Sequence, residues 1–108
     1  MPNNSFRVAQ EEVFGPVVSV LAYRDLDKAV EFANASSYGL SGQVFGADLK
    51  TALAVAERLQ TGAVSVNQGA VGAYAPSGGY KQSGLSRERG VEGLRAYQQV
   101  KHVTIGAP

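Results

Sequence analysis

The fold is decided by residues 25–67, which read DLDKAVEFANASSYGLSGQVFGADLKTALAVAERLQTGAVSVN. Two aspartates in this stretch, Asp25 and Asp48, stand where a carboxylate can accept hydrogen bonds from the first turn of a helix. Each is followed by apolar residues spaced along one face of a helix. These are Leu26, Ala29, Val30 and Ala33 in the first case, and Leu49, Ala52, Leu53, Ala56 and Leu59 in the second. The spacing therefore predicts two amphipathic helices.

Three short runs rich in β-branched residues predict strands. Residues 41–45 (SGQVF) and 63–67 (AVSVN) flank the second helix, and residues 16–23 (PVVSVLAY) precede the first. The run 16–23 is nearly all apolar, which is typical of a strand buried on both faces of a parallel sheet. Strands that alternate with helices in this way indicate an α/β fold with right-handed crossovers.

The remainder of the chain predicts a loop, a helix and a final strand. Residues 68–85 contain five glycines and a proline, so we expect no regular element there. Ser86 is placed to cap a last helix, and the polar–apolar alternation of residues 100–105 (VKHVTI) is typical of a strand at a sheet edge. The predicted order is strand–helix–strand–helix–strand–loop–helix–strand.

Composition narrows the partners that we expect. The 108-residue chain has 10 basic and 9 acidic residues, and this balance supplies no field that would attract nucleic acid or an anionic membrane. It contains no cysteine, which rules out disulfides, thiolate metal sites and a cysteine nucleophile. Neither a signal peptide nor a membrane-spanning run is evident, so we expect a cytoplasmic protein.

Three blocks of sequence together carry a resemblance to the aldehyde dehydrogenase superfamily. The first is residues 11–16 (EEVFGP), and the second is residues 38–42 (YGLSG). The third runs from residues 66–67 (VN) through 75–84 (APSGGYKQSG) to 87–88 (RE). Each block is a weak signal alone, but their common order and spacing resemble the C-terminal part of this family's catalytic domain.

The resemblance covers about residues 7–105 and implies roles for particular residues. In the family, the glutamate of the first block binds the nicotinamide-side ribose of NAD or NADP, and that residue here is Glu12. The aromatic residue that packs beside the nicotinamide is Phe14. The loop after Asn67 is expected to line the aldehyde entrance, and the strand 100–105 is expected to belong to a subunit interface. A plainer reading of Glu12 is a solvated carboxylate at the start of a strand.

The resemblance implies that residues 1–108 form a single partial domain. It also implies that parts of the family's catalytic machinery are not in this chain. The family's catalytic cysteine, general-base glutamate, oxyanion-binding asparagine and dinucleotide-binding domain all lie upstream of the matched part. The mechanism begins with attack of a thiolate on the aldehyde, so we expect no catalytic residue in this chain and no activity from the chain alone. Ser77 stands where the family commonly has phenylalanine, so the resemblance does not indicate which aldehyde is the substrate.

The other chemical signals have structural explanations. The glycine-rich loop lacks the Gly-Lys-Ser/Thr ending of a phosphate-binding loop, and no dinucleotide-binding glycine fingerprint occurs. The only histidine, His102, has no nearby aspartate or second histidine with which to hold a metal. Ser83 and Ser86 have no adjacent base that would activate them as nucleophiles.

One alternative to an enzyme segment stays open, which is a stand-alone interaction protein. An α/β unit without its neighbouring elements would leave sheet edges and helix faces uncovered. Exposed edges favour association by strand addition or exchange. In this alternative the chain forms a homo-oligomer through its sheet edges, or pairs with a full-length dehydrogenase subunit.

Overall fold

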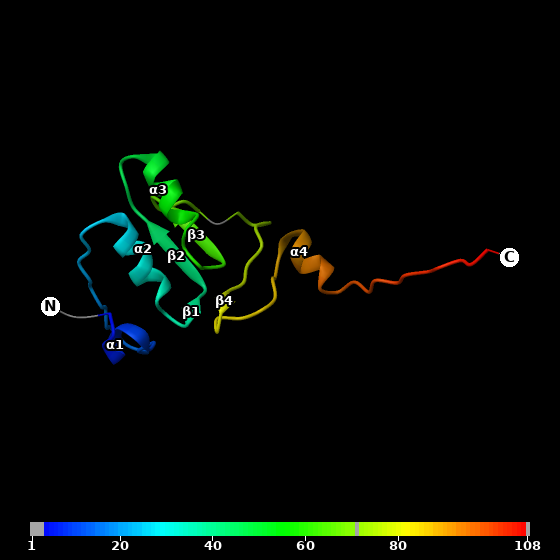
Figure 1. Ribbon diagram of the computed structural model, residues 1–108, viewed down its shortest axis with the longest axis horizontal. Coiled ribbons are helices and arrows are strands. Elements are labelled where there is room, and N and C mark those ends of the chain that lie inside the picture. Colours follow the sequence, from blue (N-terminus) through cyan, green and yellow to red (C-terminus); the bar gives the residue numbers. More distant parts are fainter. Residues whose placement is uncertain (1–3, 71, 108) are drawn as a thin grey trace.

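The computed structural model describes residues 4–70 and 72–107. Its element order agrees with the α/β class predicted from the sequence, although several boundaries differ (Figure 1). The helices are α1 (Arg7–Gln10), α2 (Leu26–Asn34), α3 (Leu49–Ala56) and α4 (Gly90–Arg95), and the strands are β1 (Tyr38–Gly39), β2 (Ser41–Val44), β3 (Ala63–Val66) and β4 (Tyr80–Lys81).

The centre of the molecule is the parallel pair β2–β3, whose strands are connected through α3 (Figure 1). Its register aligns Ser41 with Ala63 and Val44 with Val66. A second, antiparallel pair joins β1 to β4, where Tyr38 lies opposite Lys81. The strands predicted at 41–45 and 63–67 are thus confirmed, and they form one parallel ladder.

Both predicted helix starts are confirmed by their caps. The Asp25 carboxylate accepts a hydrogen bond of 2.8 Å from the backbone N–H of Lys28. Asp48 accepts one of 3.2 Å from the backbone N–H of Thr51 and another from the Thr51 hydroxyl. The hydroxyl and then the backbone N–H of Thr51 hold the pKa of the Asp48 carboxyl below its ordinary value. These bonds satisfy N–H groups that a helix leaves without an internal partner.

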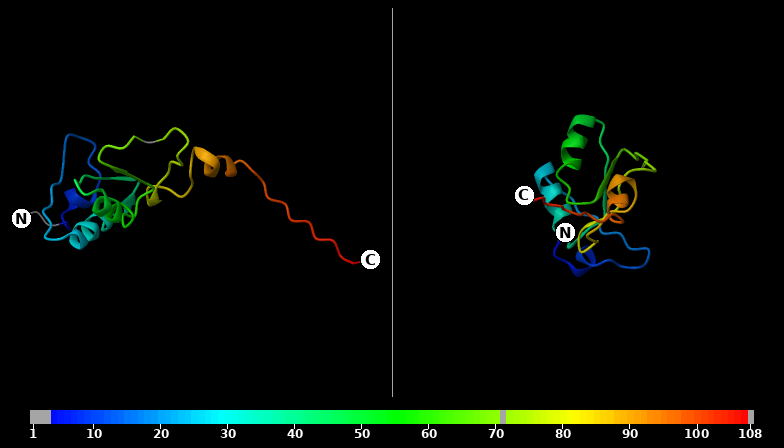
Figure 2. Two further views of the ribbon diagram at one scale, coloured as in Figure 1. Left: turned by 90° about the horizontal axis from the view of Figure 1, so that it is seen from above. Right: turned by 90° about the vertical axis from the view of Figure 1, so that its right-hand side faces the viewer.

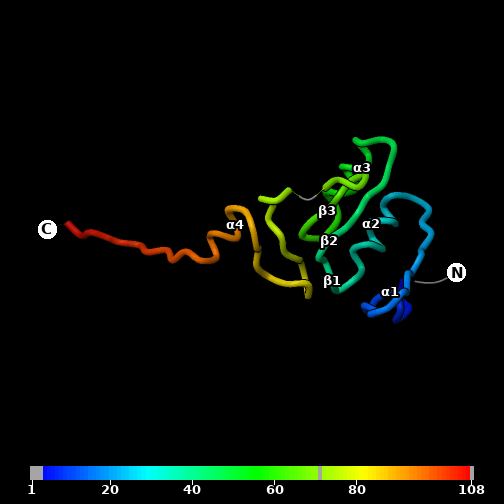
Figure 3. Tube along the Cα trace, turned by 180° about the vertical axis from the view of Figure 1, so that it is seen from behind, coloured from blue at the N-terminus to red at the C-terminus, as the bar shows by residue number. Residues whose placement is uncertain are grey.

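The core is small and lies where the two longer helices meet the sheet. Only Val30 of α2 and Ala52 of α3 are buried hydrophobic residues in the part of the chain described, at 6% and 3% exposure. Between α2, β2 and α3 an apolar hollow of about 440 Å³ remains. None of the helices that residues 4–70 and 72–107 form covers the opposite face of the β2–β3 pair (Figures 1 and 3).

The molecule is elongated. Its principal extents are 74 × 32 × 27 Å, and its radius of gyration is 18.8 Å, against about 13 Å for a compact domain of this length. The C-terminal segment extends away from α4 without folding back (Figure 2). The accessible surface is 8958 Å², whereas a compact chain of this mass exposes roughly 5,700 Å². Much apolar surface is therefore left in contact with solvent.

Two predicted strands are not formed. Residues 16–23 form neither a helix nor a strand, and Val18 is 85% exposed. Residues 100–105 likewise form neither, and Val100 is fully exposed. A strand needs a neighbouring strand to accept and donate its ladder hydrogen bonds, and no described strand pairs with either run. Residues 18–21 lie beside the helix α1 instead, where the Ser19 hydroxyl donates to the Val8 carbonyl at 3.1 Å.

The last helix and the glycine-rich loop also differ from expectation. The helix begins at Gly90 rather than after Ser86, because Glu88 is engaged in a β-bridge with Ser77 and Arg89 has a φ of 62°. Within the loop predicted to be irregular, β4 (Tyr80–Lys81) pairs with β1. The short helix α1 was not predicted, since its four residues carry no apolar periodicity.

Candidate functional site

The segment from Ser77 to Glu88, here called the closed loop, is fastened to itself. Ser77 and Glu88 exchange two backbone hydrogen bonds of 2.8 and 2.7 Å, which join the two ends. The Arg87 guanidinium donates to the Gly79 carbonyl at 2.9 Å and lies 5.3 Å from the centre of the Tyr80 ring. A cation above an aromatic face is an attractive arrangement. Despite its glycines, the closed loop has a defined conformation.

The closed loop is attached to β1 by a serine that the sequence analysis considered only as a nucleophile. The backbone N–H of Gly39 donates to the Ser83 hydroxyl at 3.0 Å, and the N–H of Gln82 donates to the Ser37 carbonyl at 3.1 Å. Gly39 is also tightly enclosed, because a Cβ there would lie 2.4 Å from the Gln60 carbonyl oxygen. A residue larger than glycine at position 39 would therefore require the backbone at Gln60 to shift.

A lysine and an asparagine, also missed at first, complete the attachment. The Lys81 ammonium donates to the carbonyls of Asn34 and Ser36 at 2.7 and 3.0 Å, at the C-terminal end of α2, where a cation is favourable. The Asn34 side chain donates to the Arg58 carbonyl at 2.9 Å and accepts from the Gln60 N–H at 2.8 Å. Together these hydrogen bonds connect α2, the residues that follow α3 and the closed loop.

All three sequence blocks line one hollow of about 370 Å³. The first block contributes Glu12, the second contributes residues 38–41, and the third contributes Ser83. Glu12 therefore lies where the blocks meet. Phe14 does not line this hollow, and its side chain is 96% exposed. The structure separates the two residues that the resemblance assigns to the cofactor.

The hollow has the chemistry of a site for a polyhydroxylated group. It has one carboxylate, that of Glu12, which can only accept hydrogen bonds, and several hydroxyls, which both donate and accept. The hydroxyls belong to Ser36, Tyr38, Ser41, Thr61 and Ser83. Among the described residues, no three His, Cys, Asp or Glu side chains gather to hold a metal ion. His102 instead contacts the Thr104 hydroxyl at 2.8 Å.

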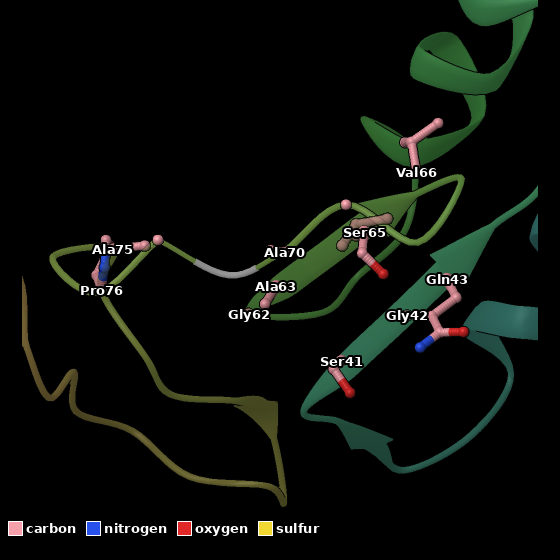
Figure 4. Close-up of a pocket in the computed structure, with 13 residues that line it drawn as sticks. Ser41, Gly42, Gln43, Gly62, Ala63, Ser65, Val66, Ala70, Ala75 and Pro76 are labelled. Atoms are coloured by element: carbon pink, nitrogen blue, oxygen red, sulfur yellow. The ribbon is translucent and has the colours of Figure 1, made fainter.

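A second pocket, here called the sheet pocket, lies over the uncovered face of β2–β3 (Figure 4). Its volume is about 520 Å³. Residues of β2 and β3, including Ser41, Gln43 and Ser65, form one side, and the loop that follows Asn67 forms the other, including Ala75. The loop that the resemblance assigns to the aldehyde entrance therefore borders a real cavity.

The fold defines a part of an α/β domain, and comparison with known proteins shows the family to which it belongs. The model of the aldehyde dehydrogenase family matches residues 2–103, so the chain belongs to the aldehyde dehydrogenase family. A putative aldehyde dehydrogenase of Staphylococcus saprophyticus is 46% identical over 101 residues, which are 94% of this chain and 21% of that protein.

Solved structures agree with the sequence relatives. Apo betaine aldehyde dehydrogenase of Staphylococcus aureus, a G234S mutant, superposes with a TM-score of 0.89 at 47% identity, over 95% of this chain and 21% of that one. Aldehyde dehydrogenase C of Pseudomonas syringae, a C291A mutant in complex with NAD+ and octanal, gives 0.85 at 46% identity, over 89% and 20%. The chain thus spans about a fifth of the length of the relatives that it matches.

The comparisons confirm the family and the fold class inferred from the three blocks. They do not test the roles of Glu12 and Phe14, which stay predictions. None of the helices in residues 4–70 and 72–107 is long and apolar enough to cross a membrane.

Proposed function

We propose that this chain is the C-terminal segment of an NAD(P)-dependent aldehyde dehydrogenase, whose reaction oxidises an aldehyde to a carboxylic acid. The observation that carries the proposal is the convergence of the three sequence blocks on the hollow that contains Glu12. Within it, the hydrogen bonds from Gly39 to Ser83 and from Lys81 to Asn34 hold the second and third blocks together. The match to solved aldehyde dehydrogenases at TM-scores up to 0.89 supports this assignment.

In this proposal Glu12 binds the cofactor through its ribose. Its carboxylate is a good acceptor for two neighbouring hydroxyls, and such charge-assisted bonds are stronger than neutral ones. Phe14 supplies an exposed ring that can pack against the nicotinamide. The cofactor, NAD or NADP, would accept a hydride in the reaction. Because the chain offers only this part of a dinucleotide site, it binds the cofactor weakly by itself.

The chain holds no nucleophile for the first step. That step requires a thiolate, and the sequence contains no cysteine. The loop after Asn67 would line the aldehyde entrance, which positions a substrate without reacting with it. The purified chain is therefore expected to give no aldehyde-dependent NADH formation.

The role of Glu12 can be tested in a chimera. We would join this chain to the upstream four-fifths of the S. aureus betaine aldehyde dehydrogenase, which it matches at 47% identity. In an active chimera, Glu12→Gln should raise the KM for NAD+ about tenfold, because charged hydrogen bonds contribute about 1.5–3 kcal/mol. Initial rates of NADH formation at varied NAD+ provide the measurement.

Glu11→Gln is the matched control for this experiment. The Glu11 carboxylate pairs with Arg7 at 2.7 Å on the surface, and it does not line the hollow. Its replacement should leave the KM for NAD+ unchanged. Equal KM values for the two variants, or an inactive chimera, would contradict the proposal. Aldehyde-dependent NADH formation by the isolated chain would contradict its dependence on an upstream nucleophile.

A second candidate function is self-association, which the exposed extended segments favour. Residues 99–107 belong to no helix or strand, and Val100, Val103 and Ile105 are 72–100% exposed. Unpaired backbone groups beside apolar side chains are a template for strand addition. The partner would be a second copy of this chain or a full-length dehydrogenase subunit.

Sedimentation velocity over a wide range of concentrations tests this second candidate. The chain should sediment as a dimer or larger species, and Val103→Lys together with Ile105→Lys should shift it to the monomer. Glu57→Lys, an exposed change outside the extended segments, is the control and should not alter the sedimentation coefficient. A monomer of the unaltered chain at every concentration would exclude self-association.

A further inference from the structure

Lys81 supplies the end of α2 with a positive charge that the helix itself lacks. The last turn of α2 (Leu26–Asn34), which lies wholly within the described residues, contains no basic side chain. The C-terminal carbonyls of a helix carry partial negative charge and favour a nearby cation. The Lys81 ammonium, from 47 residues farther along the chain, donates to the Asn34 carbonyl at 2.7 Å and to the Ser36 carbonyl at 3.0 Å. Hydrogen bonds from a charged donor are stronger than neutral ones.

The backbone of Lys81 is strained. Its φ is 55°, in the left-handed region that glycine adopts freely and lysine disfavours. Strained residues persist where surrounding contacts hold them, and they gather at functional sites. The contacts here include the pairing of Lys81 with Tyr38 and the hydrogen bond of 3.1 Å from the Gln82 N–H to the Ser37 carbonyl. Glycine at this position would relieve the strain but would supply no ammonium, so the lysine indicates that the side chain has a role.

Lys81 connects two residues that line the hollow beside Glu12, although it does not line that hollow itself. Ser36, whose carbonyl accepts from the Lys81 ammonium, lines one part of it. Ser83, two residues after Lys81, lines another part, and its hydroxyl accepts from the Gly39 N–H at 3.0 Å. The ammonium thereby holds the end of α2 against the closed loop at the place where both contribute to the hollow.

The separation of the two serines matters because both hydroxyls are oriented. The Ser36 hydroxyl accepts from the Tyr38 N–H at 3.1 Å, as the Ser83 hydroxyl does from the Gly39 N–H. A hydroxyl that accepts a backbone hydrogen bond keeps its own hydrogen for donation. A ligand hydroxyl that donates to the Glu12 carboxylate can accept from such a donor. The hollow therefore matches a group with several hydroxyls only while its serines stay at the right distance from Glu12.

We propose that Lys81 is a positioning residue of the cofactor site, because it sets the separation of Ser36 and Ser83 around Glu12. This inference rests on the proposed function, in which Glu12 binds the ribose of NAD or NADP. Lys81 does not touch the cofactor and acts through the residues that line the hollow. Its loss should weaken cofactor binding without changing the chemical step, and it should have no further effect once the Glu12 carboxylate has been removed.

The first test measures amide hydrogen exchange in the ¹⁵N-labelled chain. Lys81→Met removes the ammonium, so exchange should become about fivefold faster at Gly39 and Gln82, whose N–H groups donate across the attachment. The N–H groups of Gly46 and Asn67, at the far end of the β2–β3 pair, are the reference and should exchange as in the parent chain. Lys81→Arg keeps the charge and should recover most of the protection. Lys81→Gly relieves the strain but should behave like Lys81→Met.

The second test measures the KM for NAD+ in the chimera with the S. aureus enzyme. Lys81→Met should raise this KM about fivefold and leave kcat unchanged, and Lys81→Arg should restore most of the affinity. In the double variant Lys81→Met with Glu12→Gln, the KM should equal that of Glu12→Gln alone, since residues that act through one site are not additive. Lys50→Met, a change of an exposed lysine on α3, is the matched control and should leave the KM unchanged.

Three results would overturn the inference. These are unchanged exchange at Gly39 in Lys81→Met, equal acceleration at the reference amides, which indicates a general loss of stability, and additive effects of Lys81→Met and Glu12→Gln on the KM. The inference and the proposed function fail separately. If Glu12→Gln leaves the KM for NAD+ unchanged, the cofactor role of Glu12 is overturned. If Glu12→Gln raises the KM and Lys81→Met does not, only the positioning role of Lys81 is overturned.

Discussion

Gly62→Ala should lower the free energy of unfolding by about 3 kcal/mol, because the added methyl group has no room. A Cβ at position 62 would lie 1.6 Å from the carbonyl oxygen of Gly78 and 2.7 Å from its carbonyl carbon. Both are backbone atoms, so no side-chain rotation relieves the clash. The closed loop must move away from the start of β3, which also weakens its contacts with β1. Urea unfolding followed by circular dichroism measures the change.

The control for this experiment is Gly15→Ala. A Cβ there meets no atom within 4 Å, and the residue has no positive φ. This variant should unfold at the same urea concentration as the parent chain or slightly higher, since alanine restricts the unfolded chain. Equal stabilities of the two variants would show that the closed loop does not press against Gly62 as described.

Asn67→Ala should destabilise the chain by about 2 kcal/mol, the second largest effect that we expect. The Asn67 amide donates to the Gly46 carbonyl and accepts from the Gly46 N–H, both at 2.9 Å. It thereby continues the β2–β3 ladder by one step with a side chain. Asn67 also has a φ of 50°, a left-handed conformation that asparagine tolerates better than alanine. The same urea measurement applies.

Asn67→Gly separates the two contributions. Glycine keeps the left-handed backbone without strain and removes only the two hydrogen bonds, so its destabilisation should be about half that of Asn67→Ala. Asn67→Asp keeps the acceptor and loses the donor to Gly46, and it should fall between the parent and Asn67→Ala. If Asn67→Gly were as harmful as Asn67→Ala, backbone strain would contribute nothing.

The parts of the fold that the sequence predicts correctly are those stabilised by near neighbours. Asp25 and Asp48 cap their helices through residues three positions ahead. The strands β2 and β3 pair with each other, and only the helix α3 separates them in sequence. Residues 16–23 have the composition of a buried strand, but strand formation depends on a partner strand, and none of the strands in residues 4–70 and 72–107 pairs with them. The local sequence preference therefore predicted a strand, but it carried no information about which segment would pair with that strand.

The candidate site was predictable only where the family resemblance reached. The resemblance pointed to Glu12, and the structure gives it a hollow to line. The roles of Ser83 and Lys81 were missed, because their partners Gly39 and Asn34 lie 44 and 47 residues away. No helical or strand period reports contacts over such separations. Their place in the third sequence block, where Lys81 stands two residues before Ser83, was the available sign.

The double hydrogen bond between Ser77 and Glu88 also makes the closed loop suitable for engineering. Its two ends are held together at 2.8 and 2.7 Å, while the tip near Gly84 is open and Leu85 is 97% exposed. Extra residues inserted at the tip leave the end-to-end distance unchanged, and the entropic cost of a longer loop grows only logarithmically. A peptide tag or a fluorophore attachment sequence can therefore be carried at Gly84–Leu85 on an anchored base.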